Sequence, residues 1–179
     1  MRTDVRLSGF GGQGLGLAGF ILGRACALYE GLEAVMTQSY GPEARGGASN
    51  ADLVIADEMI DYPFVQKPNI LVTLSQEAYS KHRRYLAHEG LNLIDSELVT
   101  PEDGDQPYGL PATSLAEQLG RRIVANVVML GYFTALSQVV SRESIEESIR
   151  TTVKQKTIDL NLEAFDTGYQ YAREREHVT

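Results

Sequence analysis

The chain contains 179 residues, of which 43% are hydrophobic and 22% charged, and its formal net charge is −8 at pH 7. This length and composition predict a single globular domain over residues 1–179, and the negative charge argues against nonspecific binding to nucleic acid. The lone cysteine, Cys26, excludes an internal disulfide and a cysteine-ligated iron–sulfur cluster within the chain. A single thiol also fits a reducing cytoplasm, where we expect the protein to reside.

The first half of the chain alternates strand and helix patterns. Short apolar, β-branched segments predict strands at residues 5–8, 33–38, 52–56, 70–74 and 91–95. Residues 15–29 are apolar on nearly every side, which predicts a buried helix. Ser75 and Gly90 are suitable start and stop signals for a second helix over residues 75–89, whereas the segment 100–111, with its prolines and glycines, is expected to be irregular.

The second half of the chain is predicted to be helical. A short helix is expected at residues 113–119, and a long apolar segment follows at 123–140. That segment is long enough to cross a membrane, but it carries four polar residues that are costly in hydrocarbon, namely Asn126, Thr134, Ser137 and Gln138. We therefore expect a buried helix, or one that a partner subunit covers.

Two further helices complete the predicted fold. Ser144 and Glu147 have the spacing of a capping box, and residues 161–173 form an amphipathic pattern. Strands that alternate with helices in this order predict an α/β fold with a largely parallel sheet.

A glycine-rich segment joins the first predicted strand to the first predicted helix. Six of the twelve residues from Ser8 to Gly19 are glycine. A glycine turn that opens a helix after a strand exposes backbone N–H groups toward an anion, so it predicts a phosphate-binding site. The candidate binding residues are Gly9, Gly11, Gly12, Gln13 and Gly14.

Two other interpretations of this segment remain open. Gly9, Gly11 and Gly14 fit the G-x-G-x-x-G pattern of nicotinamide or flavin dinucleotide sites, but such sites expect an acidic residue at the end of the second strand. Here that strand ends at Gln38 and Ser39. The glycines could alternatively serve only a tight turn and close helix packing.

A second polar, glycine-containing loop follows the second predicted strand. Its candidate binding residues are Tyr40, Arg45, Gly46 and Gly47. In a parallel sheet the loops after the first two strands lie at the same carboxyl edge, where ligands bind. Arg45 could there offer a guanidinium to a phosphate or carboxylate, and Tyr40 a flat amphipathic surface. A solvated surface loop is the alternative.

Four segments, in the same order, resemble the gamma subunit of the 2-oxoacid:ferredoxin oxidoreductases. The resemblance rests on Gly11-Gly12-Gln13-Gly14, on Tyr40-Gly41-Pro42-Glu43-Ala44-Arg45-Gly46-Gly47, on Asn126-Val127-Val128-Met129-Leu130-Gly131, and on Asn161, Ala164, Phe165, Gly168 and Tyr169. It implies a Rossmann-like three-layer sandwich with C-terminal helices. It also implies a gamma-type subunit of a complex that oxidatively decarboxylates a 2-oxoacid, such as 2-oxoglutarate or pyruvate, to an acyl-CoA and reduces ferredoxin.

The resemblance further implies a division of labour among subunits. Coenzyme A would be a co-substrate bound with the help of this chain, whereas thiamine diphosphate and the iron–sulfur clusters would belong to partner subunits. The implied partners are an alpha subunit and a thiamine-binding beta subunit, with or without a ferredoxin-like subunit, and ferredoxin reached through the complex; nucleic acid and membrane are not expected. The isolated chain would be inactive.

The residues of this chain agree with a non-catalytic role. We find no Ser/His/Asp or Cys/His constellation and assign no catalytic or metal-binding residue. His82, His88 and His177 are all expected to be solvated. A nicotinamide- or flavin-dependent oxidoreductase and a purely structural subunit without a ligand remain as alternatives.

Overall fold

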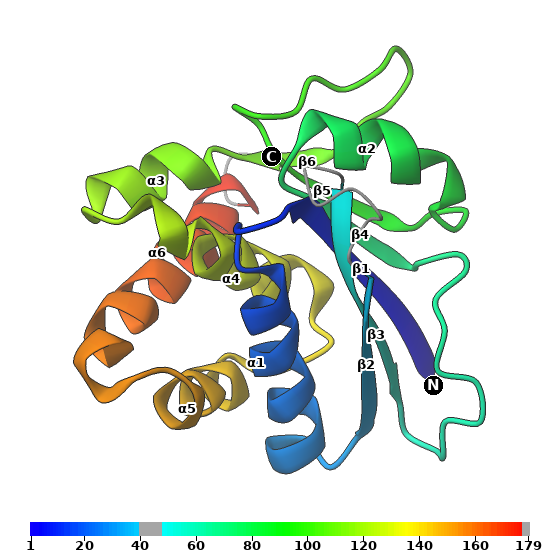
Figure 1. Cartoon of the computed structure of the whole chain (residues 1–179), viewed down its shortest axis with the longest axis horizontal. Helices are drawn as coiled ribbons and strands as arrows, with labels where there is room; N and C mark the ends of the chain where they lie inside the picture. Colours follow the sequence, from blue (N-terminus) through cyan, green and yellow to red (C-terminus); the bar gives the residue numbers. More distant parts are fainter. Residues whose placement is uncertain (40–47, 177–179) are drawn as a thin grey trace.

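A computed structural model describes residues 1–39 and 48–176. It contains a six-stranded mixed sheet in the order β2-β3-β1-β4-β5-β6, flanked by helices (Figure 1). The strands are β1 (Arg2–Phe10), β2 (Glu33–Ser39), β3 (Ala48–Ala56), β4 (Ile70–Thr73), β5 (Leu91–Asp95) and β6 (Tyr108–Leu110). The helical elements are α1 (Leu15–Tyr29), α2 (Gln76–His82), η1 (Arg83–Tyr85), α3 (Ala112–Gln118), η2 (Arg122–Val124), α4 (Ala125–Ser137), α5 (Arg142–Thr152), η3 (Gln155–Thr157) and α6 (Ile158–Glu176).

The predicted α/β fold is confirmed, with one antiparallel strand in the sheet. β1 pairs in parallel with β4, β4 with β5, and β5 with β6. β3 is antiparallel to both of its neighbours and separates β2 from β1. It begins at Ala48, earlier than predicted, because Phe10 pairs with Ala48 at one side while Asn50 pairs with Ser39 at the other.

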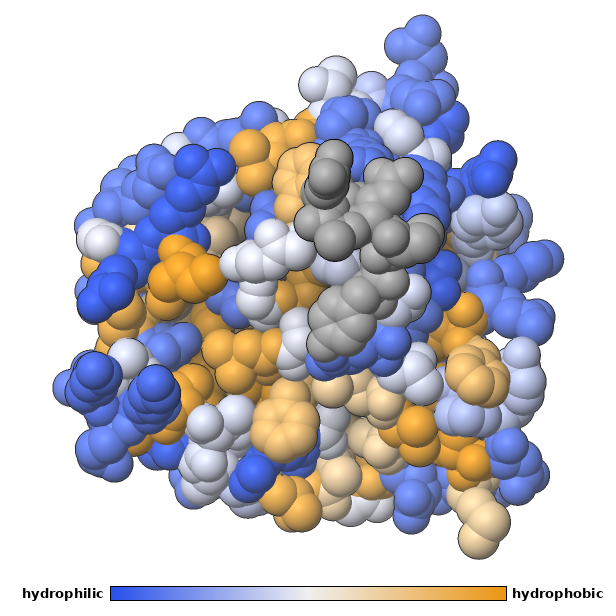
Figure 2. All heavy atoms as spheres, viewed as in Figure 1, coloured by the Kyte–Doolittle hydropathy of each residue, from blue (hydrophilic) through white to orange (hydrophobic). Residues whose placement is uncertain are grey.

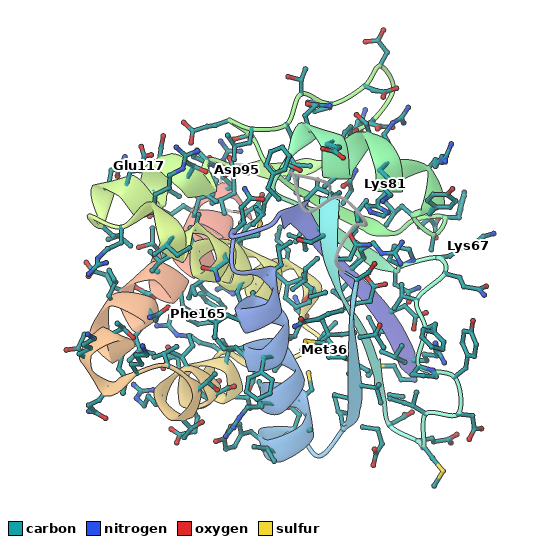
Figure 3. The ribbon with its side chains drawn as sticks, in the orientation of Figure 1. Met36, Lys67, Lys81, Asp95, Glu117 and Phe165 are labelled. Atoms are coloured by element: carbon teal, nitrogen blue, oxygen red, sulfur yellow. The ribbon has the colours of Figure 1, made fainter. Side chains whose placement is uncertain are left out.

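Helices cover both faces of the sheet. α1 packs on β1, β2 and β3, and α4 lies beside it on the same face, whereas α2 covers β1 and β4 on the opposite face (Figure 1). Met36 lies between β2 and α1 (Figure 3), and a Cβ at Gly19 would come within 2.9 Å of its sulfur. The absence of a side chain at Gly19 therefore lets α1 approach the sheet closely.

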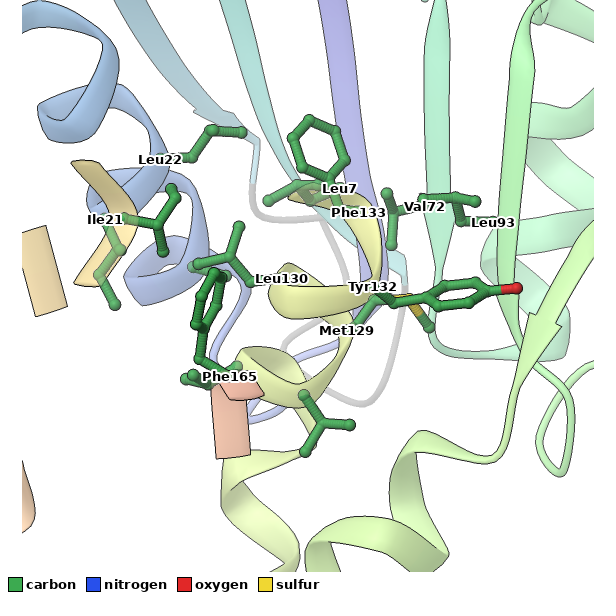
Figure 4. Packing of buried hydrophobic residues seen from close by; sticks show 14 of the residues in the cluster. Leu7, Ile21, Leu22, Val72, Leu93, Met129, Leu130, Tyr132, Phe133 and Phe165 are labelled. Atoms are coloured by element: carbon green, nitrogen blue, oxygen red, sulfur yellow. The ribbon is translucent and has the colours of Figure 1, made fainter. Parts of the chain in front are cut away.

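The main hydrophobic core lies between the sheet and the helices α1, α4 and α6. Leu7 and Val72 from the strands meet Leu130 and Phe133 of α4, and Phe165 of α6 closes the cluster from the far side (Figure 4). All ten residues from Asn126 to Ala135 are buried, which confirms the expectation that this apolar helix is internal. No described helix combines the length and the apolar content that crossing a membrane requires.

α4 and α6 cross at two glycines. A Cβ on Gly131 would overlap the carbonyl oxygen of Phe165, and a Cβ on Gly168 would overlap that of Val128. Glycine at both positions lets the two backbones touch, because any side chain would push the helices apart. The two late segments that carried the family resemblance are therefore the two sides of one helix crossing.

Three local predictions were wrong. The segment 100–111 contains β6, a short strand at the sheet edge that pairs with Leu93–Asp95 of β5. The second helix ends at His82 and continues only as a 3-10 turn, rather than running to residue 89. The cap of α5 is Ser141, whose hydroxyl accepts a hydrogen bond from the Ser144 N–H at 3.2 Å, so Ser144 is inside the helix and does not begin it.

His82 is buried, contrary to the prediction that it is solvated. Only 4% of its surface is exposed, and its Nδ1 lies 3.5 Å from Nη1 of Arg6, which forms an ion pair with Asp52. Burial, followed by the nearby Arg6 and Lys81 charges, lowers the pKa of His82 to about 4. His88 is exposed as expected, and His177 lies outside the described residues.

Candidate functional site

The glycine loop joins the end of β1 to the start of α1. Gly12 and Gly14 have φ angles of 89° and 74°, a left-handed conformation that glycine adopts without the steric cost of a Cβ. Gly14 is the N-cap of α1, and no side-chain hydrogen bond caps the helix. The first hydrogen bond of α1 joins Ala18 N–H to Gly14 C=O, so the preceding N–H groups have no acceptor within the helix.

Gln13 holds the glycine loop against the end of β4. Its Oε1 accepts a hydrogen bond from the Phe10 N–H at 2.6 Å, and its Nε2 donates to the Leu74 carbonyl at 2.8 Å. A Cβ on Gly9 would overlap the same amide oxygen. Gln13 was predicted to bind the ligand, but its amide is already bonded to the backbone, so we interpret it as a positioning residue.

Asn126, at the start of α4, holds the other end of the loop. Its Nδ2 donates to the Gly14 carbonyl at 2.8 Å, and its Oδ1 accepts from the Val127 N–H at 2.9 Å. A Cβ on Gly14 would overlap this side-chain amide. In the sequence, Asn126 stands out as a polar residue of an apolar helix and as part of a resembling segment, but its contact with a residue 112 positions away could not be inferred from local patterns.

A cavity of about 230 Å³, which we call the loop cavity, lies beside Gly12 and Gln13. It opens at the carboxyl ends of β1, β4 and β5. After β1 the chain continues into α1 on one face of the sheet, and after β4 it continues into α2 on the other face. Ligands of α/β proteins bind at such a switch point. The other lining residues are Leu74, Asp95, Thr113, Arg122, Ile123 and Ala125.

Two of these lining residues define the character of the loop cavity. Asp95, which lies near α3 (Figure 3), accepts hydrogen bonds from the N–H and the hydroxyl of Thr113 at 3.0 and 2.7 Å, so it fixes the cavity wall. The Arg122 side chain is 66% exposed, and its Nη1 is 3.6 Å from a Glu117 oxygen. Such an exposed ion pair is weak, so the guanidinium can turn to an anion. Arg122 was not predicted as a site residue, and its only signal in the sequence is its place two residues after Gly120.

The second predicted loop lies largely outside the described residues. Tyr40, Arg45, Gly46 and Gly47 all belong to the undescribed segment 40–47. The residues that flank it, Ser39 and Ala48, are at the same sheet edge as Phe10, as the strand register shows. The two loops therefore start from one edge, although β3 lies between their strands.

The geometry argues against a dinucleotide site. In such sites the second strand is next to the first and ends in an acidic residue near the ribose. Here β3 separates β2 from β1 by an additional strand. At the end of β2 the Gln38 amide lies near α1, because a Cβ on Gly16 would come within 2.7 Å of its Nε2. Within the described part of the chain, no cluster of three or more His, Cys, Asp or Glu residues could hold a metal ion.

Comparisons with known proteins agree with the resemblance seen in the sequence. The family model described as pyruvate ferredoxin/flavodoxin oxidoreductase matches residues 4–171. The 2-oxoglutarate synthase subunit KorC of Methanocaldococcus jannaschii is 53% identical over 179 residues, which cover 97% of this chain and 96% of that protein.

Two solved structures share the fold. The keto/oxoacid ferredoxin oxidoreductase gamma subunit from Geobacter sulfurreducens superposes with a TM-score of 0.88 at 39% identity, covering 97% of this chain and 98% of that one. The 2-oxoglutarate:ferredoxin oxidoreductase from Magnetococcus marinus, solved with 2-oxoglutarate, coenzyme A and succinyl-CoA bound, gives a TM-score of 0.87 at 22% identity. The match covers 97% of this chain but 31% of that longer one, and it supports the fold alone. The chain belongs to the pyruvate ferredoxin/flavodoxin oxidoreductase family and is similar throughout its length to the gamma-type subunits of 2-oxoacid:ferredoxin oxidoreductases.

Proposed function

We propose that this chain supplies the site for the anionic part of coenzyme A in a complex that oxidatively decarboxylates 2-oxoglutarate to an acyl-CoA and reduces ferredoxin. The 53% identity to a 2-oxoglutarate synthase subunit favours 2-oxoglutarate over pyruvate. Thiamine diphosphate and the iron–sulfur clusters are held by alpha and beta subunits, with or without a ferredoxin-like one, and the isolated chain is inactive.

The open glycine turn is the observation that carries this proposal. Apart from the chain neighbours, no described residue has an atom within 4 Å of the position that a Cβ would occupy on Gly11 or on Gly12. This free space adjoins the uncapped start of α1 and the loop cavity, where Arg122 offers a positive charge. Backbone N–H groups, a helix N-terminus and a guanidinium together favour a phosphate group. Arg45, Gly46 and Gly47 would add to the same site.

A charge placed at Gly11 tests the proposal. We expect Gly11→Asp to raise the KM for coenzyme A of the assembled complex about tenfold, because a carboxylate would occupy the phosphate position. Gly11→Asn, which has nearly the same shape without the charge, is the matched control and should change the KM much less. The KM for 2-oxoglutarate should stay constant in both variants.

Two results would favour the alternative functions considered from the sequence, although the relatives of this chain do not support these alternatives. An unchanged KM for coenzyme A in Gly11→Asp would leave the chain a purely structural role. Calorimetric binding of NAD(P)H or FAD by the isolated chain would instead indicate a dinucleotide site.

A further inference from the structure

A second concavity lies next to the loop cavity and is lined by Gly14 and Asn126. It has a volume of about 490 Å³, and we call it the apolar groove. Its walls come from the first turn of α1, from η2 and from the segment that joins α5 to α6. The residues that give it its character are Leu17, Ile123, Val153, Leu160, Arg121 and Lys154.

The surface of the apolar groove is mostly hydrophobic, although it is open to solvent. The exposed fractions of Leu17 and Ile123 are 40% and 55%. Figure 2 shows hydrophobic atoms gathered on this side of the molecule beside α1. The hydroxyl oxygen of Thr152, which also lines the groove, is buried and has no hydrogen-bond partner among the described residues.

The apolar groove and the loop cavity are neighbours. Ile123 lines both, and the glycine turn contributes Gly12 to the cavity and Gly14 to the groove. The loop cavity is lined by Arg122 and by the glycine turn, whereas the groove is apolar at its walls. A ligand that fills both must have an anionic portion joined to a long, uncharged and largely apolar arm.

We propose that the apolar groove binds the pantetheine arm of coenzyme A while the glycine loop holds its phosphates. This inference rests on the proposed function, since it assigns the rest of the same ligand. Pantetheine combines methylene and dimethyl groups with two amides and carries no charge, which suits apolar walls with few polar contacts. Arg121 and Lys154 also line the groove.

The experiment compares two inhibitors on the assembled complex. Desulfo-coenzyme A retains the phosphates and the arm without the reactive thiol, whereas adenosine 3′,5′-bisphosphate retains phosphate groups without the arm. We expect Leu17→Glu to raise the inhibition constant of desulfo-coenzyme A about tenfold and to leave that of the bisphosphate unchanged. Gly11→Asp should raise both constants. Ile123→Gln provides a second variant that should raise the inhibition constant of desulfo-coenzyme A; because Ile123 also lines the loop cavity, the same selectivity over the bisphosphate is not expected of it.

Leu28→Glu is the matched control. Leu28 is on the same helix, is 59% exposed, and lies about 16 Å further along the axis from Leu17. It should leave both inhibition constants and the assembly of the complex unchanged.

The outcomes separate this inference from the function on which it rests. If Gly11→Asp weakens both inhibitors while Leu17→Glu and Ile123→Gln weaken neither, the groove is not the arm site, and the phosphate site stands. If Gly11→Asp is also without effect, the proposed function fails as well. If Leu17→Glu prevents assembly of the complex, measured by gel filtration, a protein surface covers the groove and the assignment to pantetheine is wrong.

Discussion

The contact between Gly14 and Asn126 offers the sharpest test of how the glycine loop is held. In Gly14→Ala the new methyl group would overlap the Asn126 amide, which must then move away. Alanine at the φ of 74° found here costs about 1–2 kcal/mol. The displaced amide loses its hydrogen bonds to Gly14 C=O and Val127 N–H, and each contributes about 1 kcal/mol. We therefore expect Gly14→Ala to lower the free energy of unfolding by about 3–4 kcal/mol.

A double-mutant cycle separates the two causes. Asn126→Ala alone removes the same two hydrogen bonds and should cost about 2 kcal/mol. In the double variant these bonds are lost only once, so its total cost should equal that of Gly14→Ala, with a coupling energy of about 2 kcal/mol. Urea denaturation of the purified chain, followed by circular dichroism, measures all four free energies. Additivity within about 0.5 kcal/mol would refute the claim that the methyl group acts through Asn126.

Two further predictions concern the core and the pH dependence. Gly168→Ala should destabilise the protein by more than about 3 kcal/mol, because its Cβ overlaps the Val128 carbonyl and forces α4 and α6 apart. The control Gly23→Ala, also within a helix, meets only Leu53 at an ordinary 3.5 Å and should stabilise by about 0.5–1 kcal/mol; a loss of stability in both variants would contradict this explanation. For His82, whose pKa is lowered to about 4 in the folded state, the unfolded chain binds the proton more readily. The contribution of neutral His82 to the free energy of unfolding is therefore fully present above about pH 6.5, and about 3 kcal/mol of it is lost as the pH falls toward 4. His82→Gln should flatten this slope in urea midpoints measured from pH 7 to 4.5, and an unchanged slope would show that other groups cause it.

Local patterns were sufficient for the elements whose sequence carries its own signals. α1 has the bounds that the apolar segment predicted, because a glycine turn precedes it and Gly31, with a φ of 66°, follows it. The glycine turn was likewise placed from the sequence, between the first strand and the first helix.

Long-range contacts decided what the patterns could not. Whether a strand pairs in parallel or antiparallel depends on its neighbours, so the insertion of β3 between β1 and β2 was not visible in its residues. His82, at the end of α2, is buried beside Arg6 of β1, which pairs with Asp52 of β3.

The same division applies to the candidate site. The sequence by itself determined the glycine turn, the helix behind it and the two loops that carry the family resemblance. Only the tertiary structure decided that Gln13 and Asn126 hold the turn, and that Arg122 and the apolar groove lie beside it. The physical reason is that backbone conformation depends on residues next to one another, whereas side-chain contacts between α1 and α4 exist only after the chain has packed.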